Sequence, residues 1–326
     1  MTFYLLLFLV LFCLGLVFLT FSAELLVRGS SDLAALLGVS TFVIGATIVA
    51  YGTSMPEFMV SSLASLQGAS SIALGNVVGS NLFNTGLILG IAALIYPIAV
   101  PDKLHKKLSR IETPYNLVLT LIVAVMSLGL VIGRGKGIVL LVFFCAYILI
   151  MMRNELADRK LRNQENEHKK KSKRASTKTY ILLILAIIIG LVGLLASARV
   201  MVEAAIMIAG LMGISERIIG LTIVALGTSL PELAAAVAAA RKKETDMVLG
   251  NLIGSNLFNL GLILGAAAAI RPISLEPKGQ LVDFGFLLVN AGMITLFLIS
   301  WRKINRLAGC ILVGCYGLFA LALAVL

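Results

Sequence analysis

Charged residues and histidines are scarce in this chain. Of its 326 residues only 13% are charged, and there are two histidines, one tryptophan and four cysteines. A soluble domain has about a quarter of its residues charged, so this composition excludes an ordinary soluble enzyme. Both histidines lie in basic segments, and each cysteine lies alone in an apolar run. The sequence therefore predicts no zinc site, no disulfide framework and no cofactor.

Long apolar runs make up most of the chain instead. Hydrophobic residues account for 60% of the sequence, and the mean hydropathy is +1.03. A membrane-spanning helix needs about 20 apolar residues, so the chain has room for roughly ten spans joined by short loops. We therefore expect an all-α polytopic membrane protein with ten transmembrane helices. The expected helices cover residues 2–27, 39–66, 71–95, 114–132, 137–152, 179–208, 216–240, 247–269, 280–300 and 305–325.

The distribution of basic residues predicts the orientation in the membrane. The net charge is +11, and residues 153–178 alone hold ten Lys and Arg. With this loop in the cytoplasm, 21 basic residues lie on the cytoplasmic side and five on the other, as the positive-inside rule requires. Both chain termini are then extracytoplasmic. The positive charge thus reflects orientation in the lipid bilayer, and no nucleic-acid partner is expected because no aromatic residues interleave the basic ones.

The sequence contains an internal repeat. Residues 45–98 align with residues 220–273 at a constant offset of 175 without a gap, and more than half of the positions are identical. Five crossings separate equivalent helices, so the two copies have opposite orientations in the bilayer. We expect a first five-helix repeat over 1–152, a basic loop over 153–178 and a second, inverted repeat over 179–326. Inverted repeats are typical of secondary transporters, whose substrate site lies between the repeats near the membrane midplane.

Each copy of the repeat places one glutamate in the middle of an apolar helix. Glu57 follows Pro56, and Glu232 follows Pro231. A carboxylate at that depth costs a few kcal/mol, and no Lys or Arg lies at helical spacing to neutralise it. A proline inside a helix also frees the backbone carbonyl about four residues earlier. Carboxylates beside free carbonyls form a site of hard oxygen ligands, which suits Ca²⁺ or Na⁺.

The helix after each glutamate carries a stripe of polar side chains at a spacing of four residues. The stripes are Asn76, Ser80 and Asn84 in the first repeat and Asn251, Ser255 and Asn259 in the second. They either form hydrogen bonds between helices or line an ion site opposite the glutamates. The two carboxylates together match the charge of one Ca²⁺, and without it they need Na⁺ or H⁺ to offset their repulsion. We therefore expect exchange of Ca²⁺ for monovalent cations.

The motifs resemble those of a known family. GTSMPE and GTSLPE, each followed by GSNLFN, are similar to the α-repeats of the Ca²⁺/cation antiporter superfamily, and specifically to prokaryotic Na⁺/Ca²⁺ exchangers. The resemblance implies an inner-membrane location and sliding of the first and sixth helices during transport. It implies a Ca²⁺ site formed by Glu57, Glu232 and the carbonyls of Thr53 and Thr228. The flanking Na⁺ ligands would be the Ala50 and Ala225 carbonyls and the side chains of Ser54, Ser80, Ser229 and Ser255. Asn84 and Asn259 would border the central ion position.

Other functions fit the sequence less well. Some Na⁺/Ca²⁺ exchangers have Asp at the position of Asn84 or Asn259, whereas proton-coupled relatives have amides there, so Ca²⁺/H⁺ exchange is the alternative. A channel would need a ring of filter residues, which the sequence does not provide. An intramembrane hydrolase could use Ser54 or Ser229 as a nucleophile, but no histidine lies in a helix to act as base. No sequence feature predicts an oligomeric state.

Overall fold

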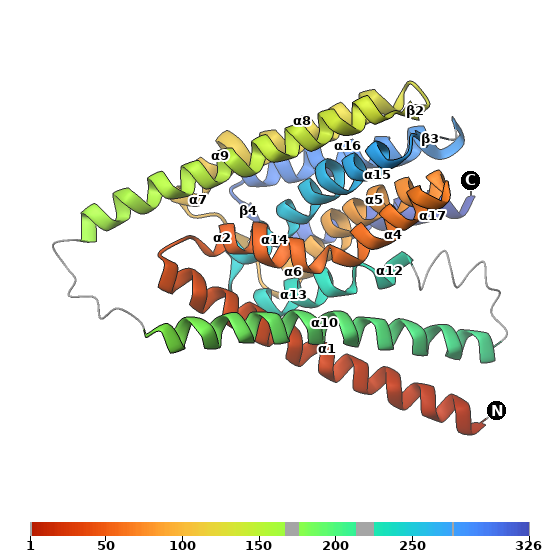
Figure 1. Cartoon of the computed structure of the whole chain (residues 1–326), viewed down its shortest axis with the longest axis horizontal. Coiled ribbons are helices and arrows are strands. Elements are labelled where there is room, and N and C mark those ends of the chain that lie inside the picture. Colours follow the sequence, from red (N-terminus) through yellow and green to blue (C-terminus); the bar gives the residue numbers. More distant parts are fainter. Residues whose placement is uncertain (1, 167–175, 213–224, 276, 326) are drawn as a thin grey trace.

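The chain is almost entirely helical. A computed structural model describes residues 2–166, 176–212, 225–275 and 277–325, and Figure 1 shows its arrangement. Within these residues, eight helices are long and apolar enough to cross a membrane, and a further bent pair of helices brings the number of spans to nine. The expected span over 216–240 falls partly on residues 213–224, which lie outside the described residues.

The first half begins with a single long helix and continues with spans built from several helical segments. Its elements, in order, are α1 (Thr2–Leu37), α2 (Thr41–Ile44), the π-helix η1 (Gly45–Val49), α3 (Ala50–Thr53), α4 (Met55–Gln67), α5 (Ser70–Leu82), the π-helix η2 (Phe83–Ile88), α6 (Leu89–Ile95), α7 (Asp102–Lys107), the π-helix η3 (Leu108–Glu112), α8 (Thr113–Ser127) and α9 (Arg134–Asn166).

The second half repeats this order where it is described, except that the single helix α16 takes the place of α7, η3 and α8. Its elements are α10 (Thr177–Leu211), α12 (Ala225–Gly227), α13 (Leu230–Arg241), α14 (Thr245–Leu257), the π-helix η5 (Phe258–Ile263), α15 (Leu264–Ile270), α16 (Pro277–Ile299) and α17 (Arg306–Val325). The change from α- to π-helix occurs at Phe83 in one half and at Phe258 in the other, at the offset of 175 found in the sequence.

Three spans extend well beyond the apolar runs predicted. Helix α1 continues ten residues beyond the expected end at residue 27. Helix α9 continues to Asn166, so the first part of the expected loop over 153–178 is helical. The fourth span begins at Asp102, well before residue 114. The extension of α9 is rich in Arg, Lys, Glu and Leu, which have good helix propensity, so charged residues at the membrane surface extend this helix without a break.

Four short strands connect the two halves crosswise. Strand β1 (Ile98–Ala99) pairs with β4 (Lys303–Ile304), and β2 (Val131–Ile132) pairs with β3 (Ile273–Ser274). By the offset of 175, β1 and β3 are equivalent strands, yet they belong to different sheets. Figure 1 shows β4, the partner of β1, at one end of the bundle and β3 at the other end. Equivalent linkers at opposite ends mean that the two halves are inverted. Both chain ends lie at the β2–β3 end (Figure 1).

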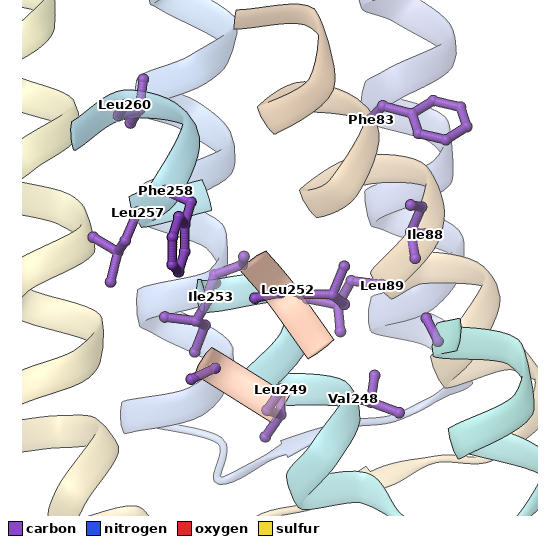
Figure 2. Packing of buried hydrophobic residues seen from close by; sticks show 14 of the residues in the cluster. Phe83, Ile88, Leu89, Val248, Leu249, Leu252, Ile253, Leu257, Phe258 and Leu260 are labelled. Carbon is purple, nitrogen blue, oxygen red and sulfur yellow. The ribbon is translucent and has the colours of Figure 1, made fainter. Parts of the chain in front are cut away.

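The core lies between the polar-striped spans of the two halves. Figure 2 shows apolar side chains of α14 and η5, from Val248 to Leu260, in one cluster with Ile88 and Leu89. Helix α14 also packs tightly on η1: a Cβ atom at Gly254 would lie 2.7 Å from Ala46 Cα. These contacts leave no room for larger residues, so they fix the separation of the segments that carry the site.

Helices α1 and α10 form a separate antiparallel pair along one side of the bundle (Figure 1). Their close approach depends on glycine, because a Cβ atom at Gly190 would lie 2.7 Å from Leu26 N. The outer face of the pair is strongly apolar, with exposed residues such as Phe18, Phe21 and Leu182. An exposed apolar surface of this length fits contact with lipid. Among the described residues, no strand lies next to α1 or α10 in the chain.

Candidate ion-binding site

The site is built at two equivalent breaks in helices. The segments Thr41–Thr53 and Met55–Gln67 form one span bent by 48°. Ser54 at this break has φ −84° and ψ 8°, and Ser229 at the break between α12 and α13 has φ −93° and ψ 6°. Pro56 follows Ser54 in the first turn of α4 and has no N–H to bond the carbonyl four residues earlier. The break therefore places the last carbonyls of α3 beyond the helical hydrogen-bond pattern.

The two glutamates are held by serines of the opposite half. The Ser54 hydroxyl donates to Glu232 Oε1 at 2.9 Å, and the Ser229 hydroxyl donates to Glu57 Oε1 at 2.9 Å. Glu57 and Glu232 are each 1% exposed. The inverted repeat thus exchanges partners across the interface, and the two halves build a single site.

The first polar stripe closes one side of this site. The Ser80 hydroxyl donates to Glu57 Oε1 at 3.4 Å and lies 3.2 Å from the Ser229 hydroxyl. Asn76 Nδ2 donates to the Glu57 backbone carbonyl at 3.2 Å, and the Thr228 hydroxyl donates to Asn76 Oδ1 at 3.5 Å. The stripe residues therefore reach the glutamate of their own half, as the sequence pattern suggests.

The second stripe is bonded differently. The Ser255 hydroxyl and both amide atoms of Asn251 are buried without a hydrogen-bond partner. In the first half Asn76 Nδ2 also donates to the Ser61 hydroxyl at 2.8 Å, but the position equivalent to Ser61 holds Ala236. The site is consequently asymmetric although its sequence is duplicated.

Several buried side-chain oxygens of the described residues have no hydrogen-bond partner, and four of them belong to the glutamates and to the last asparagines of the two stripes. These four are Glu57 Oε2, Glu232 Oε2, Asn84 Oδ1 and Asn259 Oδ1, one from each of the four segments α4, α13, η2 and η5. Buried polar atoms normally have partners, so these four free oxygens are available as ligands for a cation. Among the described residues, no cluster of three or more His, Cys, Asp or Glu could hold a metal. The available ligands are thus two carboxylates with neutral oxygens, which are hard ligands.

The other residues predicted as ligands belong to the short helices before the two breaks or lie at the breaks themselves. The Ala50 carbonyl accepts the Ser54 N–H at 3.0 Å and the Thr53 hydroxyl at 3.4 Å. Thr53 ends α3 directly before the break, and Thr228 lies directly after α12. Ala225 is the first residue of α12.

Sequence reasoning missed the two asparagines next to the serines of the stripes. Asn81 and Asn256 point across the interface between the halves and bond to the asparagines of the opposite stripe. They lie one position away from the polar stripe, so helical periodicity did not select them. Their presence in both copies of GSNLFN was the signal available.

A buried oxygen site between two inverted halves of a polytopic helical protein defines the class of secondary cation transporters. A family model described as "Sodium/calcium exchanger protein" matches residues 7–153 and 182–325. The chain belongs to this sodium/calcium exchanger family, whose members are antiporters and not enzymes.

Individual relatives agree with this membership. The sodium/calcium exchanger MaX1 of Methanosarcina acetivorans is 33% identical, over 95% of this chain and 96% of MaX1. The inner membrane protein YrbG of Escherichia coli is 35% identical, over 89% of this chain and 87% of YrbG. A solved structure of the sodium-calcium exchanger NCX_Mj, soaked with Na⁺ and Sr²⁺, is 33% identical and has a TM-score of 0.83 over 98% of both chains. The predicted exchanger fold and antiporter class are therefore confirmed.

Proposed function

We propose that the chain exchanges one Ca²⁺, bound between Glu57 and Glu232, for Na⁺. The reciprocal bonds from Ser54 and Ser229 carry this proposal, because they draw the carboxylates of both halves into one buried site. Two carboxylates supply the charge that one dehydrated Ca²⁺ requires. A divalent cation offsets the cost of burying both charges, which neither glutamate could bear unpaired.

The ligands of Ca²⁺ in this proposal are the free carboxylate oxygens and the Thr53 and Thr228 carbonyls. Na⁺ ligands flank them: the Ala50 and Ala225 carbonyls and the hydroxyls of Ser54, Ser80, Ser229 and Ser255. Asn84 and Asn259 border the centre with their free Oδ1 atoms. An all-oxygen ligand set of this kind supports Ca²⁺ and Na⁺ over softer metals.

Antiport follows from the charge of the site. After Ca²⁺ leaves, two buried carboxylates close to each other need monovalent cations before the protein can change its access. Na⁺ is proposed because MaX1 and NCX_Mj are named as sodium/calcium exchangers. Protons are the second candidate, because both Asn84 and Asn259 are neutral amides.

Inverted halves provide the two access states, and we propose that α1 and α10 slide together along the rest of the bundle. Two observations support this division. The pair shares its own glycine contacts, and the two strand pairs join other linkers of the two halves, whereas α1 contacts the bundle through side chains such as Ser31 and Lys242. Strand pairs therefore brace the rest of the bundle at both ends, and none of the described strands flanks α1 or α10.

The proposed orientation has both termini outside the cell and residues 153–178 in the cytoplasm. The membrane is the prokaryotic inner membrane, as for the relative YrbG. In support, both chain ends lie at one end of the bundle, and the end of α9 and the start of α10 lie at the other (Figure 1). Labelling of a single cysteine at exposed Ser176 by a membrane-impermeant reagent, only in inside-out vesicles, is the expected result.

Uptake of Ca²⁺ into proteoliposomes tests the function. An outward Na⁺ gradient at constant pH is expected to drive Ca²⁺ uptake, and a pH gradient without Na⁺ is not. Glu57→Gln and Glu232→Gln should each abolish uptake. Glu112→Gln is the matched control, since Glu112 is also fully buried but lies outside the site, bonded to Tyr147. Normal uptake by both site variants would disprove the proposal, and uptake driven only by the pH gradient would select H⁺ as the coupling ion.

A further inference from the structure

A chain of buried amides crosses the interface between the two halves behind the ion site. Asn84 Nδ2 donates to Asn256 Oδ1 at 3.4 Å, and Asn256 Nδ2 donates to the Thr85 hydroxyl at 2.9 Å. In the reverse direction, Asn259 Nδ2 donates to Asn81 Oδ1 at 2.9 Å, and Asn81 Nδ2 donates to the Asn256 backbone carbonyl at 3.3 Å. All five residues are buried. Each half therefore fixes the amide of the other.

These bonds decide which end of an amide is available to an ion. The oxygen and nitrogen of an asparagine side chain lie on opposite sides of the same carbon, and only the oxygen can bind a cation. In Asn84 and Asn259 the nitrogen is committed to the opposite half, and Oδ1 has no donor. If either amide turned over, it would present N–H groups to the cation and repel it.

The chain of amides is not symmetric, because one position differs between the repeats. Thr85 accepts from Asn256, whereas the equivalent residue in the second half is Leu260, which has no side-chain acceptor. Thr85 thus fixes the amide of Asn256, and Asn256 in turn offers its Oδ1 to Asn84. Asn81 reaches a backbone carbonyl in place of a hydroxyl. The orientation of Asn84 therefore depends on a threonine that lies outside the ion ligands.

We infer that Thr85, Asn81 and Asn256 are positioning residues for ion binding, which keep the amide oxygens of Asn84 and Asn259 available to the cation. This inference rests on the proposed function, since it assumes that the cation binds between the two glutamates. It assigns the residues next to the stripe a role in affinity and selectivity. It also assigns the two halves unequal roles. The Asn84 amide is held by Asn256, which is itself held by the Thr85 side chain, whereas Asn81, which holds the Asn259 amide, is held by a backbone carbonyl.

Thr85→Val provides the test, because valine has the shape of threonine without the hydroxyl acceptor. Loss of this buried hydrogen bond is expected to weaken Ca²⁺ binding to the purified transporter roughly five- to tenfold, measured by titration calorimetry. The half-saturating Ca²⁺ concentration for uptake should rise by the same factor, with the maximal rate changed less than about twofold. Thr85→Ser keeps the hydroxyl and should restore the affinity. Thr85→Ala replaces the valine variant if the latter does not fold, with the same expectation.

A merely structural role would give a different pattern. It would lower the melting temperature and the maximal rate while the Ca²⁺ affinity stayed within about twofold of the parent, and that result would overturn the inference. A serine variant as weak as the valine variant would overturn it too, because packing and not the acceptor would then matter. Glu57→Gln, measured alongside, separates the two proposals. If it still binds Ca²⁺ normally the proposed site is wrong, whereas loss of binding there with an unaffected Thr85→Val disproves the positioning role alone.

Discussion

The contact between α14 and η1 allows a direct test of how closely the two walls of the ion site must approach. The perturbation is Gly254→Ala, next to Ser255 on α14. A Cβ atom there would lie 2.7 Å from both Ala46 Cα and Ala46 O and 2.9 Å from Ala50 Cβ. Two of these atoms belong to the backbone and cannot rotate away. An ordinary contact needs about 0.7 Å more, so one element must move.

The magnitude follows from two opposing effects. Overpacking of this kind costs about 1–3 kcal/mol. Replacing glycine with alanine inside a helix returns about 1 kcal/mol through helix propensity. The matched control is Gly292→Ala in α16, where a Cβ atom meets nothing within 4 Å, so that only the propensity gain applies. Since the propensity effect cancels between the two variants, Gly254→Ala should be less stable than Gly292→Ala by about 1–3 kcal/mol.

The assay is thermal unfolding of both variants in the same detergent, followed by loss of the monodisperse peak. We expect Gly254→Ala to melt a few degrees below Gly292→Ala, whose own melting temperature should stay level with the parent or rise. Because η1 leads into the break at Ser54, Ca²⁺ uptake by Gly254→Ala should also be impaired. A Gly254→Ala protein that melts at or above the control would refute the reasoning, since α14 and η1 would then not be in close contact.

Four further substitutions probe individual hydrogen bonds. Ser229→Ala should weaken Ca²⁺ binding about tenfold, and more than Ser54→Ala, because Ser229 contacts both a carboxylate and a second hydroxyl; calorimetry showing the reverse order would contradict this. Tyr147→Phe removes the donor 2.7 Å from buried Glu112 and should cost about 1–3 kcal/mol, seen as a lower melting temperature. Ser65→Ala loses a 2.6 Å bond to a carbonyl of α15 and should cost about 1 kcal/mol in the same measurement; an unchanged melting temperature would count against either bond.

Much of the fold could be predicted because the sequence is duplicated. The constant offset predicted the inversion, and the positions of Glu57 and Glu232 in apolar helices predicted where the buried carboxylates lie. Periodicity could also place Ser80 on the same helical face as Asn76 and Asn84. What helical periodicity describes is one face of one helix. It carries no information on which side chain of another helix lies opposite that face.

The features missed by the sequence are contacts between helices. Asn81 and Asn256 lie beside the stripe, toward the opposite half, and only the packing of α5 against η5 and of α14 against η2 gives them partners. Glu112 was hidden for another reason. It follows a run of basic residues that resembles a surface loop, but the helix begins earlier and buries it against Tyr147. The basic residues at the start of the fourth span therefore made the buried pair of Glu112 and Tyr147 impossible to recognise from the sequence.

The crosswise strand pairs have a consequence for how the protein is made. A ribosome completes β1 and β2 with the first half, but their partners β4 and β3 belong to the second half. The first half is therefore in the membrane with β1 and β2 unpaired until about 140 further residues have been synthesised and β3 is available to pair with β2. Assembly of the bundle is then completed late, by the last helices to leave the insertion machinery. A chain interrupted before residue 303 would leave the linker after the third span unpaired, and such a product is a natural target for membrane quality control.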